Sequence, residues 1–126
     1  MIKTFDIGKY IYAQLSTIEA VGTRVFPLIA ENSTTYPFII YHRDSVSPSY
    51  CKDGHYEDDV QVTIQIATSD YNSGLDIAQS VREKLTSRNT IYNNQINISS
   101  EMVSASEYWN DPACVQSLTF QIKINN

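Results

Sequence analysis

The feature that most constrains the fold is a short stretch in which apolar and polar residues alternate strictly. Its apolar members are Val60, Val62, Ile64 and Ile66, and its polar members are Gln61, Thr63 and Gln65. Successive side chains of a β-strand point to opposite faces, so the pattern predicts a strand with one buried and one polar face. The branched apolar residues favour the same structure. An apolar sheet face has to be covered by other elements, which implies a sheet packed against a second layer.

Two further extended segments precede this strand. Residues 23–27 form a short extended piece that ends at Pro27, and Pro37 opens an apolar run over 38–41. Proline is tolerated at the first position of a strand, where the missing N–H matters least. Residues 44–57 carry turn-forming residues and no clear periodicity. They predict either a long loop or the tip of a hairpin that projects from the sheet, and long segments of this kind are often functional.

Two helices are predicted, over about 5–18 and about 71–87. The first has an apolar stripe at spacings of three and four, with one polar exception, and is predicted to end near Gly22. The stripe consists of Ile7, Tyr10, Ile11, Gln14, Leu15 and Ile18. The second helix begins after a capping residue, Ser69 or Asp70. Its predicted buried side consists of Leu75, Ala78, Val81, Leu85 and the stem of Arg82.

The last third of the chain is predicted to add two strands. Turns at 88–90 and 93–94 precede a weak strand marked by Ile96, Ile98 and Met102. A turn at 110–112 leads to a final strand. The apolar face of that strand consists of Cys114, Leu118, Phe120, Ile122 and Ile124. The order α-β-β-β-α-β-β predicts an α+β fold with a largely antiparallel sheet of four to five strands packed by two helices. We expect a single domain over residues 1–126, because the length suits one domain and no linker interrupts it.

Charge and composition argue against several classes of protein. The net charge is −5, and the nine basic residues are scattered along the chain. Sequence-specific nucleic-acid binding is therefore not expected, because it needs clustered Lys and Arg. No apolar run approaches the ~20 residues of a membrane-spanning helix, and no signal-peptide pattern is visible. We expect a protein that is not exported and has no membrane partner, with Cys51 and Cys114 as free thiols.

A catalytic or metal centre is not predicted. The histidines are His42 and His55, and the chain has no phosphate-binding loop or nucleophile elbow. A cluster of metal-ligating residue types comprises Cys51, Asp53, His55, Glu57, Asp58 and Asp59. Its spacing matches neither a zinc nor a calcium site. Glu101, Glu107 and Asp111 would form paired carboxylates only if the fold brought them together. We expect no enzyme activity, no catalytic residue and no cofactor or metal.

Several segments, taken in order, resemble a known protein family. Residues 21–27 read hydrophobic-Gly-x-Arg-β-branched-aromatic-Pro, and residues 36–41 read aromatic-Pro-aromatic at the start of a strand. Together with the alternating strand, the second helix and the final strand, they are similar to phage tail-completion proteins, also called tail-terminator or head–tail joining proteins. The chain departs from the family pattern at Ala67, where tryptophan is common, and at 87–89, where a glycine is common.

The resemblance implies a structural protein of a phage or prophage virion. Such proteins form a ring, typically a hexamer, that stops growth of the tail tube and offers a surface to the head connector. The implied partners are further copies of this chain, the tail-tube protein and a head-completion or connector protein. The implied location is the head-proximal end of the tail, after assembly in the bacterial cytoplasm. The alternatives are a head-closure or tail-tube protein on a similar scaffold, a small metal-dependent hydrolase, and a ligand-binding α+β domain.

Candidate interface residues follow from the same interpretation. Ring closure requires contact between two different faces of the protomer, and exposed sheet edges are natural adhesive surfaces. The segment 44–57 is the predicted arm that reaches a neighbour, because interface energy concentrates in aromatic residues. Its candidate contacts are Pro48, Tyr50, Asp53, His55 and Tyr56. Arg24 is a further candidate, which either pairs with a carboxylate of a neighbouring copy, pairs within its own chain, or is simply exposed.

Overall fold

The computed structural model describes residues 4–30, 34–50, 56–92 and 96–125. A short 3-10 helix, Thr4–Asp6, leads into helix α1, Ile7–Leu15, and the second helix, α2, is Tyr71–Leu85. The strands are β1 Val25–Pro27, β2 Phe38–Tyr50, β3 Tyr56–Thr68, β4 Ser87–Tyr92, β5 Ile96–Asn110 and β6 Ala113–Asn125.

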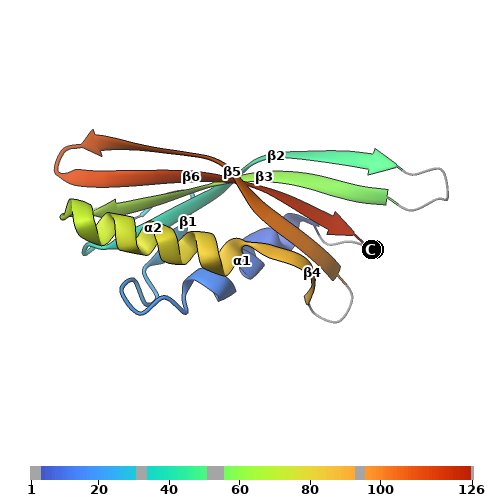
Figure 1. Ribbon diagram of the computed structural model, residues 1–126, viewed down its shortest axis with the longest axis horizontal. Helices are drawn as coiled ribbons and strands as arrows, with labels where there is room; N and C mark the ends of the chain where they lie inside the picture. Colours follow the sequence, from blue (N-terminus) through green and yellow to red (C-terminus); the bar gives the residue numbers. More distant parts are fainter. Residues whose placement is uncertain (1–3, 31–33, 51–55, 93–95, 126) are drawn as a thin grey trace.

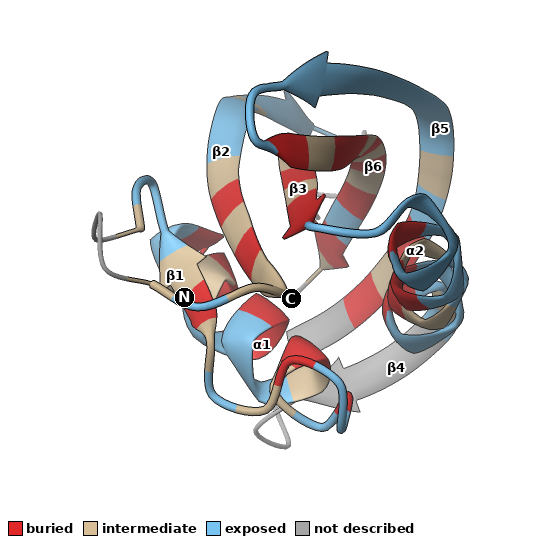
Figure 2. Cartoon of the chain, turned by 90° about the vertical axis from the view of Figure 1, so that its left-hand side faces the viewer, coloured by how far each residue is buried: buried red, intermediate tan, exposed pale blue. Residues whose placement is uncertain are grey.

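The strands form one six-stranded sheet with the order β1-β2-β3-β6-β5-β4. β1 runs parallel to β2, and every other neighbouring pair is antiparallel. Both helices lie on one side of the sheet (Figure 1), which curls strongly when it is viewed end-on (Figure 2). The predicted α+β class is confirmed. The predicted four to five strands and the order α-β-β-β-α-β-β are wrong in detail, because a sixth strand, β4, follows α2.

β4 is the strand that the sequence pattern did not reveal. Its residues, Ser87–Tyr92, are mostly polar and include the predicted turn at 88–90. The strand forms because the backbone of β5 offers a partner, with Ser87 opposite Ser100. Backbone pairing at the border of a sheet needs no apolar side-chain pattern. The predicted turn at 88–90 is therefore wrong, and the predicted turn at 93–94 lies outside the described residues.

The main core lies between the helices and one face of the sheet. Val60 of β3 is the cross-strand partner of Ile122 of β6, and both side chains are fully buried. The sheet contributes Val25, Ile39, Tyr41, Val60, Val62, Ile64, Ile66, Ile98, Leu118, Phe120, Ile122 and Ile124 to this core. The predicted apolar faces of β3 and β6 are confirmed, except that Cys114 is only half-buried.

Helix α1 carries the predicted apolar stripe. The buried members are Ile7, Tyr10, Ile11 and Leu15, and Ile18 is buried in the turn that follows. Gln14 is half-buried at the margin of the stripe. The helix ends at Leu15, earlier than predicted. Gly22 then turns the chain toward β1 with a φ of 56°, a conformation that glycine adopts without a side-chain clash.

Helix α2 begins as predicted but turns a different face toward the core. Asp70 is the N-cap, because its carboxylate accepts a hydrogen bond from the backbone N–H of Ser73 at 3.0 Å. The buried residues are Gly74, Ile77, Val81 and Leu85. The predicted buried side is partly wrong, since Leu75 is 41% exposed and Arg82 is exposed. Close packing at Gly74 favours the observed rotation, because a Cβ there would lie 3.0 Å from a β3 hydroxyl.

The segment 44–57 belongs to a long hairpin. β2 and β3 stay paired as far as Tyr50 and Tyr56, with a register shift just after Arg43. In Figure 1 this hairpin extends to the right, past both helices. Of the two predictions for the segment, the projecting hairpin is confirmed for the described residues and the long loop is wrong there. Residues 51–55 lie outside the described part.

Candidate functional site

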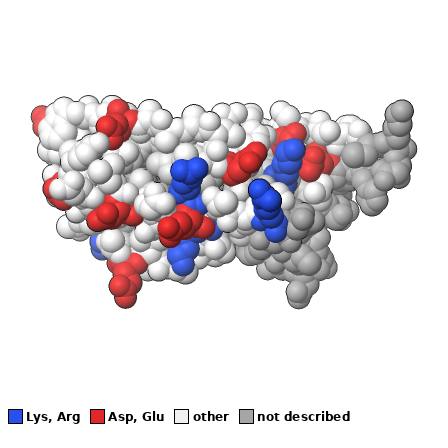
Figure 3. Space-filling model, viewed as in Figure 1, with Lys and Arg blue, Asp and Glu red and all other residues white. Residues whose placement is uncertain are grey.

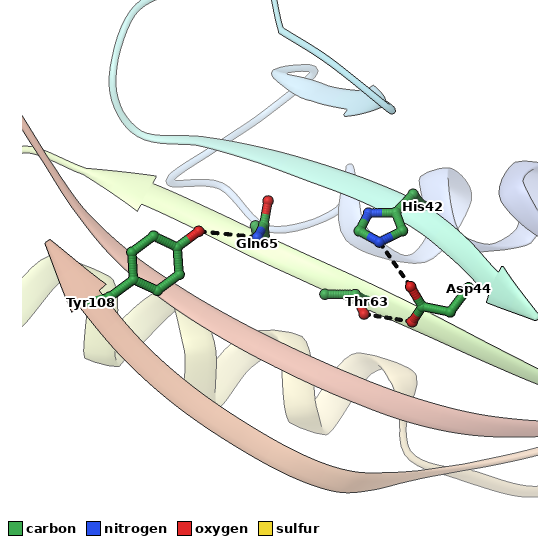
Figure 4. A network of polar contacts seen from close by, with 5 residues as sticks. All are labelled: His42, Asp44, Thr63, Gln65 and Tyr108. Atoms are coloured by element: carbon green, nitrogen blue, oxygen red, sulfur yellow. Dashed lines mark hydrogen bonds and ion pairs between the residues drawn. The ribbon is translucent and has the colours of Figure 1, made fainter. Parts of the chain in front are cut away.

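A polar network lies on the sheet face opposite the helix-packed core (Figure 4). His42 Nε2 lies 2.8 Å from Asp44 Oδ1, and the hydroxyl of Thr63 donates to Asp44 Oδ2 at 2.6 Å. On the same face, the amide of Gln65 donates to the hydroxyl of Tyr108 at 3.0 Å. The first two contacts join β2 to β3, and the third joins β3 to β5 across β6.

The first part of this network has the residue types of a catalytic triad but a different connectivity. In a triad the hydroxyl donates to the imidazole, and the carboxylate orients the imidazole. Here the hydroxyl of Thr63 and the imidazole of His42 both bond to the carboxylate of Asp44. Asp44 lies where the pairing of β2 with β3 shifts register. These bonds therefore suit the bracing of a β-bulge rather than the activation of a nucleophile.

Of the six residues considered as metal ligands, three lie in the described part of the chain and three lie outside it. Glu57, Asp58 and Asp59 lie in β3, where the hydroxyl of Thr4 donates to Asp58. The other members of the cluster, Cys51, Asp53 and His55, lie outside the described residues. Among the residues that the structure does describe, no group of three or more His, Cys, Asp or Glu could hold a metal ion.

A second polar contact joins helix α2 to the hairpin of β5 and β6. The hydroxyl of Tyr71 lies 3.0 and 2.9 Å from the two carboxylate oxygens of Glu107, and the amide of Gln116 donates to one of them at 2.9 Å. The bond from Gln116, and then the bond from Tyr71, lower the pKa of Glu107. The bond to Glu107 also raises the pKa of Tyr71. These partners of Glu107 are an amide and a phenol, so the contact does not have the form of paired carboxylates.

The predicted arm residues that are described lie on the β2–β3 hairpin. Pro48 and Tyr50 are exposed in β2, and Tyr50 is 78% exposed. Tyr56 begins β3 and is the backbone partner of Tyr50. Asp53 and His55 lie outside the described residues. The hairpin therefore presents Pro48 and Tyr50 to the surroundings beyond the helices.

Arg24 makes its described bonds within its own chain. Its Nε donates to the carbonyl of Pro37 at 2.9 Å, and its Nη2 donates to the carbonyl of Ala20 at 3.0 Å. The side chain is half-buried between these two segments. The bonds tie the turn after α1 to the residue that precedes β2.

Besides the outer edges of the border strands β1 and β4, two strand segments have an edge without a neighbouring strand in the described part of the chain. β1 pairs with β2 only at Ile39 to Tyr41, which leaves one side of residues 42–49 open. β4 pairs with β5 only as far as Ser100, which leaves one side of residues 101–110 open. The second segment carries three exposed apolar residues, Val103, Tyr108 and Trp109. Sequence reasoning missed this surface, and its available signal was a tyrosine–tryptophan pair directly before a predicted turn.

Charges of both signs are interspersed on the molecular face shown in Figure 3. That face has no continuous basic stripe of the kind that follows a nucleic-acid backbone. The described helices are all too short or too polar to cross a membrane.

Comparisons with known proteins identify the fold. No protein-family model and no curated protein matches the chain. Among solved structures, a chain of "Virion of native gene transfer agent (GTA) particle" is similar, with a TM-score of 0.73 and 12% sequence identity. The similarity covers 92% of this chain and 92% of that chain. The two chains therefore share an α+β fold over almost their whole lengths.

Proposed function

We propose that this chain is a structural protein of a phage-like virion, and specifically a tail-completion protein. In this proposal it forms a closed ring, a hexamer, at the head-proximal end of the tail tube. The ring ends growth of the tube and presents a surface to the head connector. The observation that carries the proposal is the shared fold, over 92% of both chains, with a chain of a gene transfer agent virion. The tail position rests on the resemblance of residues 21–27 and 36–41 to tail-completion proteins.

The form of the sheet supports a role in assembly. The β2–β3 hairpin extends past the helices and carries Tyr50, which is largely exposed. The β5–β6 hairpin carries Trp109, which is 62% exposed. Interface energy concentrates in aromatic residues of this kind. Two different hairpins can supply the two different surfaces that a closed ring requires.

We also propose that the protein acts through shape and self-association, without catalysis and without a cofactor. Its described polar contacts suit structural bracing. Asp44 holds the bulge of β2 against β3, and Glu107 holds β5 against α2. Residues 1–126 act as one domain in this proposal.

The experiment that tests the function combines the purified chain with the tail-tube protein of the same phage or prophage. Tube lengths and ring formation are measured by negative-stain electron microscopy. We expect rings on tube ends and an end to tube growth once the chain is added. Tubes that keep growing, with bare ends, would contradict the proposal. A head-closure protein, the nearest alternative, would bind the connector and leave tube growth unchanged.

A variant with a shortened β2–β3 hairpin tests the role of the predicted arm separately from the folding of the domain. Deletion of residues 47–56 leaves 57–59 to connect Val46 with Val60, which are cross-strand partners in the intact hairpin. Hairpin loops of about three residues are common, so the variant should fold. We expect a folded protein with the circular dichroism of an α+β domain, and a loss of rings. A shortened protein that still caps tubes would exclude the arm but not the ring.

A further inference from the structure

We propose that neighbouring copies of this chain join by pairing the open edge of β5 in one copy with the open edge of β2 in the next. The open edges are residues 101–110 and 42–49. An unpaired strand edge exposes N–H and C=O groups that can bond to another strand. The inference rests on the proposed ring and supplies the contact that would hold it together.

The two edges belong to different strands on opposite sides of the molecule. In Figure 2, β2 lies on the left and β5 on the right. In the sheet each is followed outward only by a short strand, β1 or β4, which covers part of its length. A contact between two different surfaces of the same chain is heterologous and can close into a ring. Pairing of one edge with itself would stop at a dimer.

Strand direction favours the same contact. β2 is antiparallel to β3, β3 to β6, and β6 to β5. β2 and β5 therefore run in opposite directions within one copy. A neighbour that continues the sheet in the same sense presents its β2 antiparallel to β5 of the first copy. The contact thus uses the pairing that already dominates the sheet, and antiparallel pairs are slightly the more stable kind.

The register also sets how two neighbours are placed. Val46 lies within the open part of β2 and pairs with Val60 of β3. Val60 pairs with Ile122 of β6, and Ile122 pairs with Ser100 of β5, so Val46 and Ser100 lie at the same level along the strands. The open part of β5 begins just beyond Ser100. Neighbouring copies must therefore be offset along the strands by about half an open segment, roughly 15 Å at about 3.3 Å per residue. Such an offset tilts the strands relative to the ring axis, as the closure of a sheet requires.

Small side chains follow both edges on the same face of the sheet. The exposed serines are Ser45, Ser47 and Ser49 in β2 and Ser104 and Ser106 in β5. Ser47 pairs with Asp59, and Ser106 pairs with Ser117, which places both opposite the helix-packed core. Small side chains allow a second backbone to approach closely. Pro48 lies in the β2 edge and has no N–H to donate, which limits indiscriminate pairing there.

Disulfide cross-linking tests this contact directly. In a C51S/C114S background that still forms rings, S106C is combined in separate variants with S45C, S47C or S49C. These pairs share a face, so one of them should bring two Cβ atoms of neighbouring copies within the roughly 4 Å that a disulfide needs. We expect that variant, after oxidation, to give a non-reducing gel ladder that ends at the closed ring.

Matched controls distinguish this contact from others. S106C with T17C, an exposed position that follows α1, should give no ladder. Each single-cysteine variant alone should stay uncross-linked, whereas a mixture of the two productive singles should give one covalent dimer. Self-cross-linking of S106C, or cross-linking only to another protein, would overturn the proposal.

The failure of this inference and the failure of the proposed function give different results. Rings without a cross-link from any of the three pairs would overturn the edge contact and leave the ring in place. If the chain is absent from particles, the proposed function fails. In that case the presence or absence of cross-links between purified copies still decides the edge contact.

Discussion

The hydroxyl of Tyr71 bonds to the carboxylate of Glu107, with distances of 3.0 and 2.9 Å to its two oxygens, and so joins the first residue of α2 to β5. Gln116 of β6 donates to the same carboxylate at 2.9 Å. The carboxylate of Glu107 therefore links α2, β5 and β6. Next to it, Trp109 and Tyr108 are exposed on the hairpin. The contact fixes the hairpin that the proposed assembly uses.

Replacement of Glu107 by glutamine should flatten the acid side of the stability profile. The folded pKa of Glu107 lies below its ordinary value of 4.5, because Gln116 and Tyr71 donate to the carboxylate. A lowered folded pKa contributes stability that is present above the unfolded pKa and is lost as the pH falls through the folded pKa. Urea unfolding at a series of pH values below neutrality measures the effect. The control is Glu101→Gln on the same strand, and an E107Q variant with the wild-type acid response would contradict the prediction.

Replacement of Asp70 by alanine should lower the free energy of unfolding by about 1 kcal/mol, the usual effect of losing an N-cap. Asp70 accepts from both the backbone N–H and the hydroxyl of Ser73, each at 3.0 Å. Asp70→Asn keeps an oxygen acceptor and should retain most of the stability. Denaturant unfolding compares the three proteins. Equal stability of the alanine variant and the wild type would show that the cap contributes nothing.

The Leu28→Gly variant should have a free energy of unfolding about 1 kcal/mol higher than that of the Leu28→Ala variant. The φ of Leu28 is 69°, in the left-handed region, and its side chain is 75% exposed, so little packing is lost on substitution. A Cβ is strained in this conformation, and glycine has none. Thermal or urea unfolding of Leu28→Gly against Leu28→Ala measures the difference. The opposite order of stability would mean that the backbone there is not left-handed in solution.

Replacement of Arg24 by alanine should destabilise the monomer by about 1 kcal/mol, because two carbonyl acceptors, one in a part-buried contact and one in an exposed contact, lose a charged donor. Those acceptors belong to Pro37 and Ala20. Arg24→Lys should recover only part of the loss, since one ammonium group cannot reproduce the guanidinium fork. Unfolding and ring formation are measured together. An R24A protein with wild-type stability and no rings would assign Arg24 to the interface instead.

The parts of the fold that sequence predicted are those encoded by side-chain periodicity. The alternation along β3 determined which side chains are buried, and Val60 and Ile64 are fully buried as expected. The apolar stripe of α1 was predicted from its spacing for the same reason. The face that α2 turns toward the core was not predicted, because it depends on the close approach of Gly74 to Thr68, a tertiary contact without a local signal. β4 was missed because it is held by backbone pairing at the border of the sheet.

The candidate site was predicted less well than the fold. Pro48 and Tyr50 were singled out as turn-forming and aromatic residues in an aperiodic segment, and the structure describes them as exposed parts of a strand. The open edge at 101–110 had no comparable signal, because serines and aromatics there follow neither period. An edge is a property of the strand order, and strand order emerges only when distant segments pair.

The measurement that tests the central proposal most directly is electron microscopy of particles from cells that lack the gene for this chain. Tail lengths and head attachment are scored with and without the gene restored in trans. We expect tails of broad and excessive length without attached heads, returning to uniform headed particles on restoration. Particles of normal tail length with heads attached, in the absence of the gene, would contradict the proposed ring at the end of the tail.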